Sequence, residues 1–199
     1  KIEMEILRND EVIGYNNYFF ERDGETTTVK NQYKFEVKLL SATIFKVEGY
    51  GEEIYLNDRL ISFQSKTLQN KKEKFVSLKL DKNKKKFNIK GSSYSGEASL
   101  KSTIGNWWSH KILQAESQIS PISGSIKEQL ITFIGKENIA INGKEFETDH
   151  FKLTSKDMSL PEDKRLNFDI WLDKKTSVIV KVTYERMGNW AVSYTHLRA

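Results

Sequence analysis

Apolar residues recur at every second position through almost the whole chain, and this alternation constrains the fold more than any other feature. It is clear at the start, from Ile2 to Ile6, and again near the end, from Leu166 to Leu172. A period of two is typical of a strand with one buried face. Short polar turns separate the alternating segments, and helical crossovers are absent. The sequence therefore predicts an antiparallel meander, because parallel strands need long connections.

Turn signals support the same architecture. Asp23-Gly24 and Asn142-Gly143 are dipeptides that favour tight hairpins, since such turns need positive φ angles. Some dozen strands in one sheet accumulate twist and leave exposed edges, so a flat arrangement is unfavourable. We predict a mostly β protein with a strongly curved antiparallel meander sheet, either a half-barrel or an open barrel.

One segment interrupts the alternation, Ser102 to Pro121 (STIGNWWSHKILQAESQISP). A helix could form there, and the pair Trp107-Trp108 is the densest aromatic point of the chain. A curved sheet leaves a concave face that something must cover. We expect this segment to be a short helix or loop that plugs the concave face.

The 199 residues fit one β domain, which we place at residues 1–190. After Trp190 the sequence AVSYTHLRA loses the alternation and resembles a short foreign sequence derived from a linker. We therefore expect residues 191–199, including His196, to be a non-native or disordered tail. The chain begins at Lys1, and either a removed signal peptide or trimming would give such a start.

Charge is mildly positive and locally concentrated. The chain has 32 basic and 27 acidic residues, and nine lysines with only two acids lie between Lys71 and Lys90. A basic patch formed by Lys82, Lys84, Lys85 and Lys86 could hold an anionic polymer, a protein partner or lipid headgroups. The alternative is a solvated hairpin tip. Aromatic patterns typical of RNA-binding sheets are missing, so we expect no nucleic acid partner.

Catalytic and metal-binding motifs receive little support from the sequence. The three histidines are isolated, cysteine is absent, and no phosphate-binding loop or nucleophile elbow occurs. We expect a protein that is not an enzyme and has no cofactor or metal. An enzyme built around His110 or Asp169 is the less favoured alternative. No apolar run reaches the roughly 18 residues of a membrane-spanning helix, so no transmembrane segment is expected.

Aromatic residues are the best candidates for a binding site. Trp107 and Trp108 either fill the core or line a pocket between plug and sheet, where an apolar small molecule or lipid could sit. The candidate ligand-binding residues are Trp107, Trp108, Trp171, Tyr94 and His110.

Several stretches together resemble a known bacterial family. They are IGYNNYFFERDG, FEVKLLSATIFKVEG, NWWSHKIL, PISGSIKEQLITFIGKENIAINGKEFETDHFKLTS and LNFDIWLDKKTSVIVKVTYER, within Lys1 to Arg186. The chain is similar to domain-of-unknown-function family 6134, whose members are uncharacterised envelope proteins. The resemblance implies export to the periplasm, a sheet akin to lipoprotein-carrier half-barrels, and an envelope protein as a possible partner. It carries no established activity.

Overall fold

The computed structural model describes residues 1–40, 42–186 and 190–198, which form fifteen strands and two short 3₁₀ helices. The N-terminal wing of the sheet comprises β1 (Ile2–Arg8), β2 (Glu11–Asp23), β3 (Thr26–Leu39), β4 (Ala42–Leu56), β5 (Arg59–Gln69), β6 (Lys72–Asp81), β7 (Lys86–Gly91) and β8 (Ser95–Ser99). The remaining elements are β9 (Ser102–Ile104), η1 (His110–Leu113), β10 (Ser117–Ile119), β11 (Ile126–Ile141), β12 (Lys144–Ser155), η2 (Glu162–Lys164), β13 (Asn167–Asp173), β14 (Ile179–Arg186) and β15 (Trp190–Arg198).

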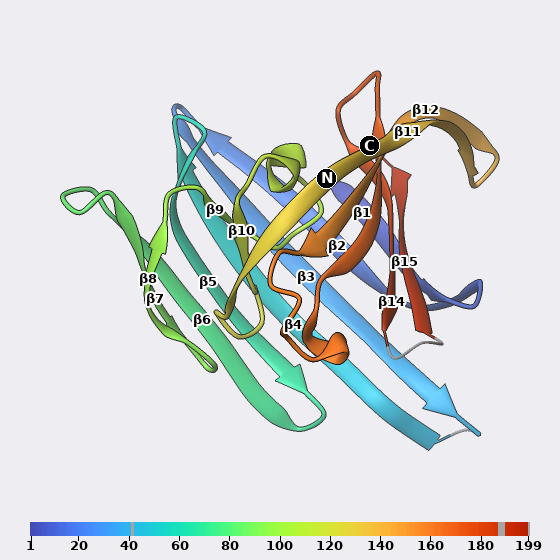
Figure 1. Ribbon diagram of the computed structural model, residues 1–199, viewed down its shortest axis with the longest axis horizontal. Helices are drawn as coiled ribbons and strands as arrows, with labels where there is room; N and C mark the ends of the chain where they lie inside the picture. Colours follow the sequence, from blue (N-terminus) through green and yellow to red (C-terminus); the bar gives the residue numbers. More distant parts are fainter. Residues whose placement is uncertain (41, 187–189, 199) are drawn as a thin grey trace.

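The strand order is β8-β7-β6-β5-β4-β3-β2-β1-β15-β14-β13-β12-β11-β10-β9. Neighbours are antiparallel except for the parallel pair β9–β10. Because β1 pairs with β15, the two ends of the chain meet in the middle of the sheet. The two edge strands, β8 and β9, are consecutive in the chain, yet no pairing between them occurs in the described residues. The sheet is therefore a meander that curls without closing, as Figure 1 shows, which confirms the predicted fold class.

Hairpin turns occur where the sequence predicts them. Gly24 has a φ of 57°, and Asn142 and Gly143 have φ angles of 50° and 77°. These are left-handed conformations that glycine and asparagine adopt at low cost. The alternation is irregular between residues 134 and 139, yet residues 126–141 form the single long strand β11. A bulge between Phe133 and Gly135 absorbs the irregularity in the alternation.

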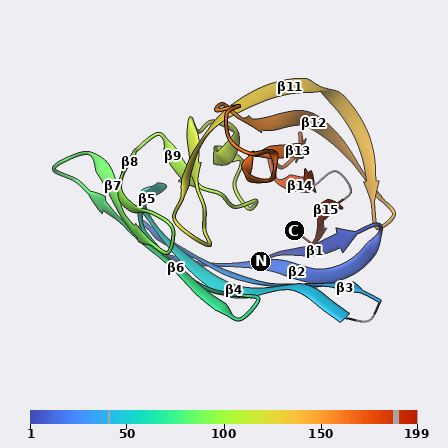
Figure 2. The same ribbon diagram turned by 60° about the horizontal axis from the view of Figure 1, so that its bottom comes forward.

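The tryptophan-bearing segment lies inside the curl of the sheet (Figure 2). We call residues 105–116, between β9 and β10, the plug. Its helix is a single 3₁₀ turn, His110–Leu113, which Ser109 caps by accepting a hydrogen bond from the Lys111 backbone N–H. The opposite, C-terminal wing of the sheet comprises β11 to β15. Trp107 and Ile112 of the plug join one hydrophobic core with strands of both wings. No helix among the described residues has the length and apolar character needed to cross a bilayer.

The last strand differs from the expectation for the C-terminal segment. Residues 190–198 form β15, which pairs antiparallel with β1 on one side and β14 on the other. For residues 191–199 we predicted a non-native or disordered tail, because the apolar alternation fades after Trp190. Backbone hydrogen bonding explains the difference, since a segment between two strands can complete both ladders whatever its apolar pattern. That these residues are foreign to the protein stays a prediction.

Candidate functional site

The concave face of the N-terminal wing is built from cross-strand rows of inward-facing residues. The register aligns them across β2, β3, β4 and β5, and alternate residues of each strand share the face. Three successive rows are Gly14-Phe35-Val47-Gln69, Asn16-Tyr33-Gly49-Thr67 and Tyr18-Asn31-Gly51-Ser65. In the middle row glycine leaves room for the Tyr33 ring, because a Cβ at Gly49 would lie 2.6 Å from Tyr33 Oη.

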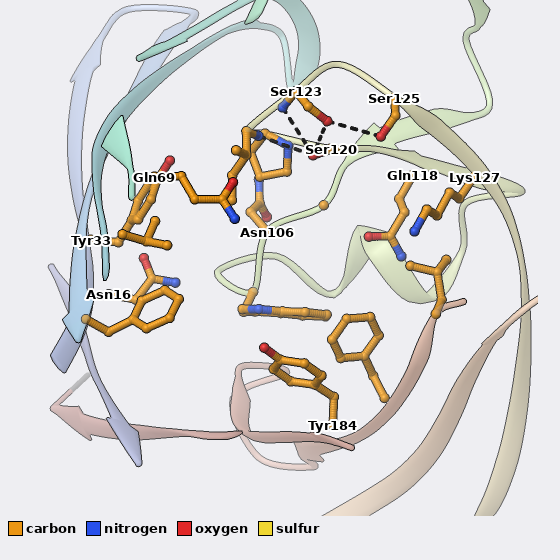
Figure 3. A pocket seen from close by; sticks show the side chains of 18 of the residues that line it. Asn16, Tyr33, Gln69, Asn106, Gln118, Ser120, Ser123, Ser125, Lys127 and Tyr184 are labelled. Atoms are coloured by element: carbon orange, nitrogen blue, oxygen red, sulfur yellow. Dashed lines mark hydrogen bonds between the residues drawn. The ribbon is translucent and has the colours of Figure 1, made fainter. Parts of the chain in front are cut away.

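A cavity of about 420 Å³ lies above these rows. Its walls combine the N-terminal wing, the plug with its flanking loop, and strands β13 and β14 of the opposite wing. Figure 3 shows Asn16, Tyr33 and Gln69 on one side of the open space and Gln118 with Lys127 on the other. Segments that are distant in the sequence therefore meet at one site, because the curl of the sheet brings them together.

The cavity lining is mixed, whereas the sequence led us to expect an apolar hollow. Aromatic rings contribute, including Trp107, Phe168 and Tyr184. Six carboxamides also line it, namely Asn16, Asn31, Gln69, Asn106, Gln118 and Asn167. The difference arises because Asn16 and Asn31 occupy inward positions of otherwise apolar strands, where alternation alone assigns buried apolar groups.

Polar groups on the cavity floor are joined to one another and to the plug. Asn31 Nδ2 donates to Asn16 Oδ1 at 2.6 Å, and Asn16 Nδ2 donates to Tyr18 Oη at 3.0 Å. The backbone N–H of Trp107 also donates to Tyr18 Oη, at 3.3 Å. Burial raises the pKa of the Tyr18 phenol, so it stays protonated at physiological pH. The floor is thus preorganised by neutral hydrogen bonds.

Glu53 of β4 is a buried carboxyl on the same concave face, one row beyond the row of Gly51, with 2% of its surface exposed. Its Oε1 accepts hydrogen bonds from Asn106 Nδ2 at 2.7 Å and Trp108 Nε1 at 2.9 Å, and its Oε2 accepts one from Tyr55 Oη at 2.5 Å. Burial raises the pKa of Glu53 to about 7, against the opposing effect of these donors. The sequence analysis did not identify Glu53 as a site residue. Its position could have indicated burial, because Glu53 is in phase with inward-facing Gly51 and Tyr55 on the same strand.

Comparison with known proteins places this architecture in a family. The sequence matches the model described as a domain of unknown function (DUF6134) over residues 4–193. The chain belongs to this family. The membership confirms the resemblance inferred from the sequence, and no curated protein matches this DUF6134 chain.

A solved structure has the same fold. The crystal structure of a beta-barrel-like protein of domain of unknown function DUF1849 from Brucella abortus is similar, with a TM-score of 0.63. The two sequences are 11% identical, and the match covers 99% of this chain and 94% of that one. At this identity the similarity establishes the fold alone.

The two adjacent tryptophans of this DUF6134 chain have different surroundings. Trp107 lines the cavity and packs edge-on against Phe168, with ring centroids 5.0 Å apart. Trp108 instead packs between Phe20 and Tyr55, at 5.4 and 5.7 Å. Trp107 is therefore available to a ligand in the cavity, while Trp108 anchors the plug to the sheet.

The other three candidate ligand-binding residues do not line this cavity. Trp171 belongs to a second hydrophobic cluster with Ile141 and Val180. Tyr94 donates its hydroxyl hydrogen to the carbonyl of Glu97 at 2.9 Å. His110 begins η1, and its side chain makes no hydrogen bond or ion pair within the part of the chain that the structure describes. The structure does not bring the five candidates together.

Asp169 is the centre of a polar cluster on the other face of β13. Its Oδ1 lies 2.9 Å from His150 Nε2 and its Oδ2 lies 2.6 Å from Lys152 Nζ. Burial pushes the pKa of Asp169 upward, but the hydrogen bonds from Lys152 and His150 outweigh it and hold the pKa below its usual value. Within the described ranges, no group of three or more histidine or acidic side chains is arranged to hold a metal ion.

The basic patch is partly neutralised. Lys84 and Lys86 both pair with Glu97, with Nζ-to-carboxylate distances of 3.2 and 2.8 Å. Lys82 and Lys85 lie in the turn between β6 and β7 and are exposed. The pairing lowers the positive charge that this hairpin can offer to an anionic partner.

Proposed function

We propose that the protein is a non-enzymatic envelope protein that holds a small lipid-like ligand in the cavity between the concave sheet and the plug. The observation that carries the proposal is the cavity of about 420 Å³ with Trp107 in its wall. Ligand sites of this kind are concave, have volumes of about 300 to 1,000 Å³, and combine aromatic walls with a few polar groups.

The chemistry of the lining favours binding over catalysis. Burial raises the pKa of Tyr18 and of Tyr33, so neither phenol supplies a base near neutral pH. The aromatic surfaces of Trp107 and Phe168 can bury the apolar part of a ligand, and the neighbouring carboxamides can orient a polar end.

Export to the envelope rests on the family resemblance and is part of the proposal. Cell fractionation of the native bacterium with an antibody to this chain tests it. We expect the protein in the periplasmic fraction, and recovery with the cytoplasmic proteins would contradict this part.

Tryptophan fluorescence tests the binding. We expect that adding an alkyl ligand such as a medium-chain fatty acid shifts the emission to the blue, because the ligand displaces water next to Trp107. The Trp107→Phe variant should lose the shift. The Trp171→Phe variant is the matched control and should keep it, since Trp171 belongs to the separate cluster. Unchanged emission with every alkyl ligand, together with no heat of binding, would overturn the proposal.

A further inference from the structure

We infer that the polar end of the ligand is an uncharged group with adjacent hydroxyls, as in a glycosyl or glycerol unit. This inference rests on the proposed function and names the chemistry of the ligand in the same cavity. It depends on which polar groups face the open space and on which of them already have partners.

Five of the six lining carboxamides have hydrogen-bonding capacity left over in the described residues, because Asn31 and Gln118 use their amide nitrogens but not their oxygens. Gln69 and Asn167 line the cavity and make no side-chain hydrogen bond within the described residues, and Asn106 uses its Nδ2 for Glu53 but not its Oδ1. In Figure 3 the Gln69 carboxamide points into the open space. A carboxamide presents a donor and an acceptor side by side, and a hydroxyl is both donor and acceptor. Adjacent hydroxyls therefore complement such a lining.

Two of the three cations that line the cavity have other partners, and the two lining carboxylates, Glu162 and Asp163, are exposed in η2. Arg165 donates to the carbonyls of Leu160 and Met158 at 2.7 and 2.6 Å, and Lys127 donates to the carbonyl of Lys164. Lys74 is the remaining lining cation, and it lies on β6, beyond Thr67 in the middle row. One half-buried lysine near an edge of the sheet is a weak match for a carboxylate or phosphate, which bind best to several donors held in fixed geometry. The lining thus favours a neutral polar group.

Aromatic rings beside the carboxamides suit a sugar or glycerol unit as well. Phe168 packs against Trp107 and against Tyr184, with the second pair of ring centroids 5.3 Å apart. The C–H faces of a sugar ring pack on such aromatic surfaces, while its hydroxyls extend sideways to hydrogen-bonding partners. The site offers both kinds of contact around one space.

A matched series of octyl compounds separates the possibilities. Octyl glucoside, octyl sulfate and octyltrimethylammonium share one chain and differ in headgroup, and each is titrated calorimetrically into the full chain below its micelle concentration. We expect octyl glucoside to bind at least about tenfold more tightly than either charged compound, a difference of about 1.4 kcal/mol. Equal or tighter binding of octyl sulfate or of octyltrimethylammonium would overturn this inference and leave the proposed function standing. Failure of all three compounds to bind would overturn both.

Methyl glucoside distinguishes a glycolipid headgroup from a free sugar. Much weaker binding than that of octyl glucoside supports a lipid-borne headgroup. Equal binding supports the inference about hydroxyls but contradicts the lipid-like part of the proposed function.

Two variants of the same strand locate the binding. Gln69→Met keeps the length of the side chain and removes the donor and acceptor that could bond the ligand, whereas Gln64→Met makes the same change at an exposed position on the convex face of β5. Losing one or two hydrogen bonds to a neutral ligand should weaken octyl glucoside binding by about five- to tenfold in the first variant. The second variant should bind like the unmodified protein. Undiminished binding by Gln69→Met would overturn the inference.

Discussion

Trp108 donates its indole N–H to Oε1 of Glu53 across 2.9 Å, and this bond fastens the plug to the concave face of β4. Asn106 donates to the same oxygen at 2.7 Å. The residue between them, Trp107, is the one that lines the cavity. One buried carboxyl therefore holds both neighbours of the tryptophan that we assign to the ligand, which makes Glu53 a positioning residue for the site.

Replacing Glu53 with methionine should release the plug. The change leaves the buried donors of Asn106 and Trp108 without an acceptor, and each such group costs about 1 to 3 kcal/mol. We expect a loss of about 2 to 4 kcal/mol in the free energy of unfolding, measured by urea denaturation.

The matched control for this variant is Glu48→Met on the same strand. Glu48 is on the convex face, with half of its side chain exposed, and pairs with Lys34 at 3.4 Å. An exposed ion pair contributes little, so the control should stay within about 1 kcal/mol of the unmodified protein. Similar losses in both variants would contradict the role of Glu53.

The raised pKa of Glu53 predicts a pH dependence of stability. Between the ordinary value of 4.5 and about 7, the folded chain keeps the Glu53 proton while the unfolded chain has released it. The unfolded state then binds fewer protons, so stability falls as pH rises through this window and is constant above it. The full effect corresponds to about 3 kcal/mol.

The Glu53→Gln variant isolates this effect, because its carboxamide cannot ionise. Urea unfolding at pH 5 and pH 8 should show that the unmodified protein loses about 2 to 3 kcal/mol more than the variant over this interval. Other titrating groups contribute equally to the pH dependence of both proteins, so their effects on the difference cancel. A parallel pH dependence of the two proteins would show that Glu53 does not titrate in this window.

The meander could be predicted from the sequence because strand period and turn chemistry are local properties. Asn142-Gly143 specifies its hairpin through its own backbone preferences, and its flanking strands follow. The extent of the curl, the pairing of β1 with β15 and the parallel pair β9–β10 could not be predicted. These are contacts between residues distant in the chain, on which alternation carries no information.

The candidate site likewise has features that could be predicted from the sequence and features that could not. The aromatic density of the plug drew attention to Trp107, which belongs to the hydrophobic core and also lines the space between plug and sheet. Trp171 was placed with it on chemical type alone, and the structure puts it in another cluster beside His150. Glu53 and Gln69 were missed because their importance comes from what faces them across the sheet.

Gly49 should be intolerant of a side chain. A Cβ there would lie 2.6 Å from Tyr33 Oη and 2.8 Å from the carbonyl oxygen of Lys66. The backbone carbonyl cannot move away easily, so Gly49→Ala should cost about 1 to 3 kcal/mol through overpacking. It should also weaken ligand binding, since Tyr33 forms part of the cavity wall.

Gly135→Ala provides the control for this substitution. Nothing lies within 4 Å of a Cβ built at Gly135, which is in β11 next to the bulge. Alanine there restricts the unfolded chain, so the variant should be neutral or more stable by up to about 1 kcal/mol. Thermal unfolding of both variants tests the pair, and equal effects would contradict the steric argument.

The pairing of β15 with both β1 and β14 makes a final prediction. In the strand order β15 lies between β1 and β14. Among the described residues, β1 and β14 each pair with β15 and not with one another, so only β15 connects the two wings of the sheet by backbone hydrogen bonds there. Ending the chain at residue 189 should leave two unpaired strand edges in the middle of the sheet. Such edges favour association between chains. We expect the shortened chain to lose cooperative urea unfolding and to elute as oligomers in size-exclusion chromatography. A shortened chain that remains monomeric with an unchanged urea midpoint would instead support the expectation that residues 191–199 are foreign to the protein.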